Sequence, residues 1–580
     1  MILFAALLLA AAMWFPAADW TERPDPVASP HAKKGGTVRF SGGQPLKSFN
    51  GYVDNSAYAR MAFSLMYETL LSTDAQTLDF APHLARRWAI SQDGREFTFE
   101  LDQNAKWSDG RAVTATDVKW TFDQVLDPAN LTGSWKTMLG VFDSPEVVGT
   151  KTVRFRKKAG SGKDWRDLLH CAFFPILPRH AFEGKNFNAL DFLSAPVGGP
   201  YRLSRTVEQV ETEFARNPQW WRAESASARG MYNFDRIVLR YYADNENAFE
   251  AFKKKTIDVY PVYTARIMQK ETHGEKFDKN WIVRRRISNH KPVGFQGFAM
   301  NQRRFPFDDP AARRAMAMLI DRETMNRTMM FGEYFLLSSF YSDLYDPEHP
   351  CPNAFHAYDP ARARKTLEEA GWRLNGKGML EKNGREFRFT FLSRSGTEDK
   401  FLALFDHALK QCGIQMEIVR KDFASWMRDM DEFSYQMTWA AYGAGVFRSP
   451  ETMFLSSEAD RKGSNNITGF RSAEVDKLIE AEKGMNTMAE RTAAYREIDR
   501  LVAAETPYAF LWMTAETRLL YWNKFGTPQT ILGKYSDEEG ILTYWWYDVD
   551  RAEELERAQA ERTCLPVVPE RIDYDTEMMK

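Results

Sequence analysis

The feature that most constrains the fold of this 580-residue chain is a repeated alternation of strand patterns and helix patterns. Short segments of alternating apolar and polar residues predict β-strands, and longer segments with apolar residues three and four apart predict amphipathic helices. Such an alternation along one chain is typical of α/β lobes with mixed β-sheets. The predicted strands lie at residues 37–40, 95–101 and 234–242, and the predicted helices at residues 57–71, 245–254, 308–330, 359–370 and 549–561.

Turn and cap residues mark the start of one further helix. Asp109-Gly110 is typical of a tight turn, and Thr114 stands at the N-cap position with Asp117 three residues later. In a capping box, the side chains at these two positions accept hydrogen bonds from each other's backbone N–H groups. The sequence therefore predicts a capped helix that begins after Thr114.

The N-terminus carries a short apolar segment. Residues 2–12 are all Ile, Leu, Phe or Ala, and Pro16-Ala17-Ala18 offers small residues for cleavage. This length suits a signal peptide, whereas a membrane span needs about 20 apolar residues. We predict a signal peptide over residues 1–18 and a soluble periplasmic protein, although no Lys or Arg precedes the apolar segment. A buried N-terminal helix is the alternative interpretation.

The charge balance argues against two classes of partner. Lys and Arg total 77 and Asp and Glu total 79, which gives a formal net charge of −2. Such a balance provides no general attraction to nucleic acid or to an anionic membrane. The 41 Phe, 22 Tyr and 17 Trp residues suffice for a large hydrophobic core. The four cysteines, for which three disulfide pairings are possible, are Cys171, Cys351, Cys412 and Cys564.

The sequence offers no positive evidence for catalysis. It contains no Gly-x-Ser-x-Gly, His-Glu-x-x-His or Cys-x-x-Cys motif. His349, Cys351 and His356 lie close together in the sequence, but the prolines among them favour a structural loop over a metal site. We therefore predict no enzyme activity and no cofactor. An exported hydrolase stays open as an alternative, because the many acidic residues do not exclude a glycosidase pair.

Several segments together resemble one protein family. Trp107-Ser108-Asp109-Gly110, the elbow Gly198-Gly199-Pro200-Tyr201, Phe307-Asp308-Asp309 and the helix pattern at residues 473–479 are similar to periplasmic solute-binding proteins of the peptide/nickel class, family 5. The resemblance runs in the family's order from about residue 35 to residue 550. Within the class, the chain most resembles the Yej-type oligopeptide-binding proteins; the segments that carry this likeness are residues 233–237, 247–253, 512–519, 522–525 and 544–548.

This resemblance implies a fold and a role. The fold is α/β, a two-lobed periplasmic-binding-protein fold (type II, cluster C) with an extra subdomain in the first lobe. The role is to capture oligopeptides in a cleft between the lobes and to deliver them to the permease of an ABC importer. We expect a monomer. The implied domains are lobe I from residues 19–55, 196–295 and 511–580, an inserted subdomain from residues 56–195, and lobe II from residues 296–510.

A peptide ligand agrees with simple physical chemistry. An extended peptide has one donor and one acceptor per residue, and exposed strand edges can satisfy both. Roomy pockets that contain water then tolerate many side chains. Closure of two lobes about a hinge buries the ligand.

The resemblance places Trp439 and Tyr442 at ligand-contacting positions. Many peptide binders of the class have an Asp at the position of Tyr442, which holds the amino terminus of the peptide. We therefore predict a ligand whose amino end is modified, absent, or held elsewhere by a residue such as Asp54. The open alternatives are another small polar solute, namely an opine-like conjugate, an oligosaccharide or a nickel chelate, and a pure interaction protein.

Five further residues are weaker candidates for ligand contact. Arg448 can pair with a ligand carboxylate, and a surface ion pair is the alternative. Asn465 and Asn466 can bind peptide groups, and ordinary turn hydrogen bonding is the alternative. For Trp135 and Trp512 burial in the core is the favoured interpretation.

Overall fold

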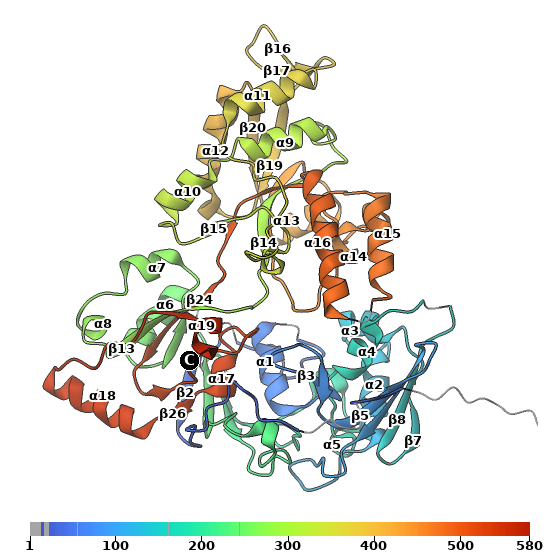
Figure 1. Cartoon of the computed structure of the whole chain (residues 1–580), viewed down its shortest axis with the longest axis vertical. Helices are drawn as coiled ribbons and strands as arrows, with labels where there is room; N and C mark the ends of the chain where they lie inside the picture. Colours follow the sequence, from blue (N-terminus) through green and yellow to red (C-terminus); the bar gives the residue numbers. More distant parts are fainter. Residues whose placement is uncertain are drawn as a thin grey trace, which may run out of the picture. The chain divides into compact units, whose positions relative to one another are not determined.

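The computed structural model describes residues 13–16, 22–43, 45–54, 56–160, 162–242, 244–485 and 487–579. The chain divides into two compact units, coloured along the sequence in Figure 1. Unit 1 contains Met1–Tyr263, Thr272–Asn289 and Glu516–Lys580, and unit 2 contains Thr264–Glu271 and His290–Ala515. Most of the predicted signal peptide, residues 1–12, 17 and 18, lies outside the described residues. Within the described part of the chain, no helix has the length and apolar character needed to cross a membrane.

Unit 1 is built on a mixed sheet of eight strands. Its strands come from widely separated parts of the chain, in the order β27-β13-β24-β12-β2-β11-β10-β9. Strand β2 runs parallel to β11 and β12, whereas β24 runs antiparallel to β12 and β13. The strands are β2 (Thr37–Ser41), β9 (Tyr201–Val207), β10 (Glu211–Arg216), β11 (Arg236–Arg240), β12 (Val259–Pro261), β13 (Ile282–Ser288), β24 (Glu516–Trp522) and β27 (Arg571–Asp573).

A second, antiparallel sheet in unit 1 has the order β1-β5-β6-β8-β7. The predicted capping box is confirmed here, because the side chains of Thr114 and Asp117 each accept from the other's backbone N–H at the start of α2. The remaining strands of unit 1 are β1 (Met13–Phe15), β3 (Leu71–Thr73), β4 (Phe80–Pro82), β5 (Ala85–Ile90), β6 (Glu96–Leu101), β7 (Glu146–Gly149), β8 (Thr152–Arg156), β25 (Phe525–Gly526) and β26 (Trp546–Tyr547).

The helices of unit 1 agree well with the predicted patterns at two places, residues 245–254 and 549–561. The predicted helix at residues 57–71 is shorter in the structure, because α1 ends at Met66 and the chain turns into β3. The helices are α1 (Ala57–Met66), α2 (Ala115–Leu126), α3 (Gly133–Leu139), α4 (Arg166–Ala172), α5 (Arg179–Phe182), α6 (Asn245–Lys253), α8 (Glu275–Asp278), α17 (Gly540–Tyr544), α18 (Val549–Glu561) and α19 (Tyr574–Met578).

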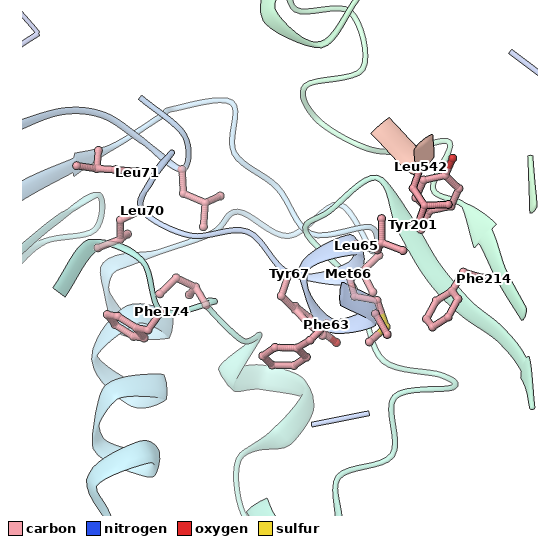
Figure 2. Close-up of a cluster of buried hydrophobic side chains, with 14 of the residues drawn as sticks. Phe63, Leu65, Met66, Tyr67, Leu70, Leu71, Phe174, Tyr201, Phe214 and Leu542 are labelled. Atoms are coloured by element: carbon pink, nitrogen blue, oxygen red, sulfur yellow. The ribbon is translucent and has the colours of Figure 1, made fainter. Parts of the chain in front are cut away.

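The core of unit 1 gathers around α1. Figure 2 shows Phe63 and Met66 from this helix near side chains from the sheet and from neighbouring loops. The predicted Gly/Pro elbow lies on the end of α1, where the N–H of Gly199 donates to the carbonyl oxygen of Met66 at 2.8 Å. A Cβ on Gly199 would lie 2.6 Å from the carbonyl oxygen of Leu65, so the contact requires glycine.

Unit 2 is built on a mixed sheet with the order β20-β19-β21-β14-β22. Strand β19 runs parallel to β20 and β21, and β14 runs antiparallel to β21 and β22. The strands of unit 2 are β14 (Phe295–Met300), β15 (Phe335–Leu336), β16 (Arg373–Leu374), β17 (Leu380–Lys382), β18 (Arg385–Glu386), β19 (Arg388–Ser393), β20 (Gln415–Arg420), β21 (Met437–Tyr442), β22 (Tyr508–Phe510) and β23 (Trp512–Met513).

The long helix predicted at residues 308–330 is wrong, because the structure has two helices there. The first ends at Met318, and the carboxylate of Asp321 caps the second by accepting from the N–H of Thr324 at 3.0 Å. Figure 1 shows α15 and α16 of this unit side by side. The helices are α7 (Ala265–Lys270), α9 (Pro310–Met318), α10 (Arg322–Met329), α11 (Pro360–Glu369), α12 (Asp399–Gln411), α13 (Phe423–Asp431), α14 (Glu451–Phe454), α15 (Ala473–Glu482) and α16 (Met488–Ala504).

Two stretches of the chain form unit 2. The chain passes from unit 1 to unit 2 after Tyr263 and again after Asn289, and it returns after Glu271 and after Ala515. The predicted lobes, with bounds after residues 295 and 510, stay a prediction. The inserted subdomain at residues 56–195 stays a prediction.

Candidate ligand-binding residues

Strand β21 carries two of the predicted ligand contacts, Trp439 and Tyr442. All six of its residues pair with β14 on one side, from Met437 with Met300 to Tyr442 with Phe295. On the other side its register with β19 covers only Met437 and Thr438. The C-terminal half of β21 therefore extends past the end of β19.

Because of this extension, the backbone N–H and C=O of Ala441 point to the edge of β21 on which β19 lies, but beyond the end of β19. Along a strand, the N–H and C=O groups of successive residues point to alternate edges. The carbonyl oxygen of Gln436 accepts from the N–H of Asn301, so even-numbered residues of β21 face β14. Ala441 then faces the opposite edge, where no strand of the described residues pairs with it, and it is exposed.

Trp439 lies half-buried in an aromatic group of unit 2. Its Nε1–H donates to Oε1 of Gln296 at 3.0 Å, and Nε2 of Gln296 donates to the carbonyl oxygen of Trp512 at 2.8 Å. The Trp439 ring packs edge-on against Phe401 at 5.5 Å and Trp512 at 6.0 Å between centroids. Trp512 is only 2 % exposed, which agrees with the favoured interpretation of core packing.

Tyr442 stacks on Phe295 with 5.3 Å between the ring centroids and an interplanar angle of 25°. Burial raises the pKa of Tyr442 to about 12, so its hydroxyl is uncharged at neutral pH. A neutral phenol does not supply the negative charge that an Asp provides at this position for an α-ammonium group.

Gly294 fixes how closely the chain before β14 approaches Tyr442. A Cβ at this glycine would lie 2.0 Å from the carbonyl oxygen of Tyr442. No side chain fits at that distance. A glycine is therefore needed to hold the end of β21 in place.

Arg448 already has an anionic partner in its own unit. Its guanidinium forms an ion pair with Oδ2 of Asp343 and lies 4.8 Å from the ring centroid of Tyr341. Arg448 is only 6 % exposed. The alternative of an ion pair therefore describes this arginine in the structure, although the pair is buried rather than at the surface. A contact with a ligand carboxylate stays a prediction without support from this geometry.

The two asparagines after Gly463 differ in exposure. Asn465 is exposed, whereas Asn466 is fully buried. The Nδ2 of Asn466 donates to the carbonyl oxygens of Leu455 and Phe470, and its Oδ1 accepts from the N–H of Phe470 at 2.9 Å. The polar groups of Asn466 are thus satisfied within unit 2, as the turn interpretation expects.

In unit 1, Asp54 is engaged by its own loop. Its carboxylate accepts from the backbone N–H groups of Ser56 at 2.9 Å, Lys47 at 3.1 Å and Ser48 at 3.4 Å. Burial acts to raise the pKa of Asp54, but these hydrogen bonds outweigh it and lower the pKa below its ordinary value. The charged carboxylate therefore organises the loop.

Trp135 lies on α3 and is partly buried. Its ring packs edge-on against the fully buried Tyr52, with 5.1 Å between centroids. This contact agrees with the favoured interpretation of burial.

The structure brings together two of the eight predicted residues, Trp439 and Trp512, on one face of the sheet of unit 2. Tyr442 packs on the opposite face of the same strand, against Phe295. The structure also adds Gln296 and Ala441, which the sequence analysis missed. A polar residue between Phe295 and Gly297, in an otherwise apolar segment, was the available signal for Gln296. Nothing in the sequence distinguishes Ala441, because its role depends on where β19 ends.

A cavity of about 580 Å³ lies elsewhere, within unit 1. None of the eight predicted residues lines it; its walls include Asp25, Phe80, His83, Trp220, Arg222 and Tyr544. Among the described residues, no group of three or more His, Cys, Asp and Glu side chains is placed to hold a metal ion. The four cysteines are all free thiols.

Comparison with known proteins identifies the family. The model for "Bacterial extracellular solute-binding proteins, family 5 Middle" matches residues 79–464. This match covers more than half of the chain. The chain belongs to the family 5 solute-binding proteins. The predicted family, the α/β fold class and the solute-binding role are thereby confirmed.

Relatives of this family 5 protein cover nearly its whole length. It is 26% identical over 560 residues to the probable peptide-binding protein YejA of Agrobacterium fabrum, covering 89% of this chain and 90% of that one. It is 25% identical over 528 residues to the peptidoglycan-binding protein YepA of the same organism, covering 83% and 85%. The structure of the oligopeptide-binding protein AppA from Bacillus subtilis, in complex with a nonapeptide, superposes with a TM-score of 0.67 at 20% identity and covers 89% and 99% of the two chains.

Proposed function

We propose that this family 5 protein is the periplasmic receptor of an ABC importer and that its ligand is an oligopeptide. It acts as a monomer, binds the peptide without chemical change and passes it to the permease. The likeness to a probable peptide-binding relative and to a structure with a bound nonapeptide supports this assignment.

The single observation that carries the proposal is the free edge of β21. The N–H and C=O of Ala441 lie on the edge that β19 leaves uncovered. A peptide laid along this edge can exchange backbone hydrogen bonds with Ala441, as an added strand does. Half-buried Trp439 and Tyr442 on the same strand supply apolar contact for side chains of any sequence. This mode of binding suits a receptor that accepts many peptides.

A second candidate ligand is a peptide with a modified amino end, such as a fragment of peptidoglycan. Two observations favour it. Tyr442 is neutral, and the carboxylate of Asp54 is occupied by three backbone N–H groups. One relative is a peptidoglycan-binding protein. A ligand without a free α-ammonium group needs no carboxylate at either position.

Native mass spectrometry of the purified protein, followed by denaturation, identifies what it carries. Short peptides of mixed sequence are the expected result, and fragmentation reports whether their amino ends are free. A single sugar or metal chelate would overturn the peptide assignment and keep the receptor. Release of a hydrolysed product on incubation with the identified ligand would instead favour the hydrolase alternative.

The role of the β21 edge has its own test by calorimetry. Ala441→Pro removes the backbone N–H, and we expect peptide affinity to fall at least about tenfold. The matched control Ala441→Ser keeps the N–H at the same exposed position and should bind as the wild type does. Equal affinity of both variants, with unchanged melting temperatures, would show that the peptide does not pair with this edge.

A further inference from the structure

A polar cavity of about 310 Å³ lies in unit 2 at the other end of β21. It opens beside the residues that enter the strand, Ser434 and Gln436. Along β21, Trp439 lies about 10 Å and Ala441 about 17 Å from Gln436, at roughly 3.3 Å per residue. The residues around the cavity are Arg304, Phe305, Arg385, Thr390, Ser434, Tyr435 and Gln436.

Two arginines line this cavity, and each is held by a contact that leaves donors free. The Nε–H of Arg304 donates to the carbonyl oxygen of Phe433 at 3.0 Å, so its terminal amino groups stay available. The guanidinium of Arg385 lies 3.6 Å from the ring centroid of Phe305. Stacking on an aromatic face holds the planar guanidinium and leaves its edge available for hydrogen bonds.

The positive charge of these two arginines is not neutralised by the described part of the chain. Neither guanidinium comes within 4.0 Å of a carboxylate there, and none of the residues lining the cavity is acidic. The neighbouring carboxylate of Glu386 accepts instead from Nε of Arg388 at 2.6 Å. That of Asp309 accepts from Nζ of Lys382 at 2.7 Å. These two acids are therefore engaged with other cations.

The rest of the wall is neutral and ordered by its own hydrogen bonds. The hydroxyl of Thr390 donates to Oε1 of Gln436 at 3.0 Å, and Nε2 of Gln436 donates to the carbonyl oxygen of Phe305 at 2.7 Å. These bonds hold the loop beneath Arg385. Ser434 is exposed at the rim and offers a hydroxyl to a ligand.

We propose that this cavity binds a phosphate or sulfate group, free or carried on a small molecule. Two guanidinium groups present several N–H donors in planar arrays, which match the oxygens of a tetrahedral oxyanion. The cavity has the volume of about ten water molecules, more than a bare ion fills. An organic group attached to the anion therefore fits as well.

Calorimetric titration with inorganic phosphate at constant ionic strength tests the assignment. Saturable binding by the wild-type protein is expected, and Arg304→Gln/Arg385→Gln should weaken it at least about tenfold. The matched control is Arg420→Gln/Arg500→Gln, which removes the same charge from exposed arginines of the same unit that pair with Asp399 and Glu497. This control should bind phosphate as the wild type does.

Two further arms identify the source of the anion. Glycerol 3-phosphate that binds tighter than inorganic phosphate would indicate a phosphorylated small molecule, and equal binding would indicate the free ion. Loss of phosphate binding in both double variants, or in neither, would overturn the proposal. Melting temperatures within about 2 °C of the wild type exclude a folding defect. Peptide affinity is expected to stay unchanged, so this proposal and the proposed function fail independently.

Discussion

Among the buried carboxylates, Glu68 in unit 1 and Asp499 in unit 2 each lie in a network of donors, and the two networks differ in the kind of donor. In unit 1, Glu68 is 3 % exposed and accepts from Nε1 of Trp220 at 2.8 Å and Nε1 of Trp221 at 2.7 Å. Nε2 of His83 lies 3.4 Å from the same carboxylate, and Arg222 adds a second positive group.

In unit 2, Asp499 is fully buried and accepts only from neutral groups. Its four donors are the hydroxyls of Ser339 and Tyr345, the N–H of Phe340 and Nδ2 of Asn353, all at 2.7–2.8 Å.

The pKa values of the two carboxylates shift in opposite directions. Burial acts to raise both. For Glu68 the charge of His83, its hydrogen bond and Arg222 prevail and lower the pKa below 4.5, its ordinary value. For Asp499 burial prevails over four neutral donors, and the pKa is raised above 3.8. Nearby positive charge, rather than the number of hydrogen bonds, therefore decides the direction.

The largest expected effect is that of Asp499→Ala, which leaves four donors without an acceptor. We expect the free energy of unfolding of unit 2 to fall by about 4 kcal/mol. Hydrogen exchange of the α16 amides measures the change for this unit alone. Asp499→Asn keeps one acceptor oxygen and should cost about half as much. A loss below about 1 kcal/mol for the Ala variant would mean that water replaces the carboxylate.

Asp343 sharpens the comparison, because its partner Arg448 carries a permanent charge. Arg448→Gln leaves a partly buried carboxylate without its cation and should lower the free energy of unfolding by about 3 kcal/mol. The double variant Arg448→Leu/Asp343→Leu should recover most of this loss. Peptide affinity separates the two interpretations of Arg448. If Arg448→Gln lowered the affinity for peptides with a free carboxyl terminus and not for amidated peptides, Arg448 would be a ligand contact.

His83→Gln removes the group that most lowers the pKa of Glu68. We expect the free energy of unfolding of unit 1 to fall by only about 1 kcal/mol, because the carboxylate of Glu68 keeps both indole donors. Hydrogen exchange of the β5 amides at neutral pH reports it. The matched control is His180→Gln, since His180 pairs with the half-exposed Asp109 at 2.8 Å in the same unit. The His180→Gln variant should lose less stability than His83→Gln.

The smallest expected effect is a difference in pH dependence between Glu68→Gln and Asp499→Asn. The stability that Glu68 contributes is present above its unfolded pKa and is lost as the pH falls through its lower folded pKa. The stability cost of Glu68→Gln should therefore shrink on acidification. The folded pKa of Asp499 is raised, so the stability that protonated Asp499 contributes is lost as the pH rises through that pKa. The stability cost of Asp499→Asn should therefore shrink as the pH rises. Parallel profiles from urea unfolding at several pH values would contradict the contrast.

Local patterns predicted local structure well. The pattern at residues 549–561 gave α18 with the same bounds, and Thr114 and Asp117 form the expected capping box. The break before α10 was missed because apolar periodicity continues through it, and only the hydrogen bond from Thr324 N–H to Asp321 reveals the cap.

The candidate site was predictable only in part, because its properties depend on distant pairs. Trp439 and Tyr442 followed from the family resemblance. The partner of Arg448 lies 105 residues away in the sequence. Outside the candidate site the same holds for Glu68, whose two indole donors lie 152 and 153 residues away. No spacing or composition signals such pairs. The free edge at Ala441 depends on where another strand stops.

Strand β24 governs the order in which the chain can assemble during synthesis. It lies between β13 and β12 inside the sheet of unit 1, yet it begins at Glu516, after every strand of unit 2 has left the ribosome. Unit 2 can thus fold while the chain is still being synthesised. Strands β12 and β13 keep unpaired edges until β24 has been synthesised. Open edges of this kind are where chaperones bind and where mispairing begins. A chain that ends at Ala515 therefore contains all of unit 2, but its unit 1 lacks β24 and β27.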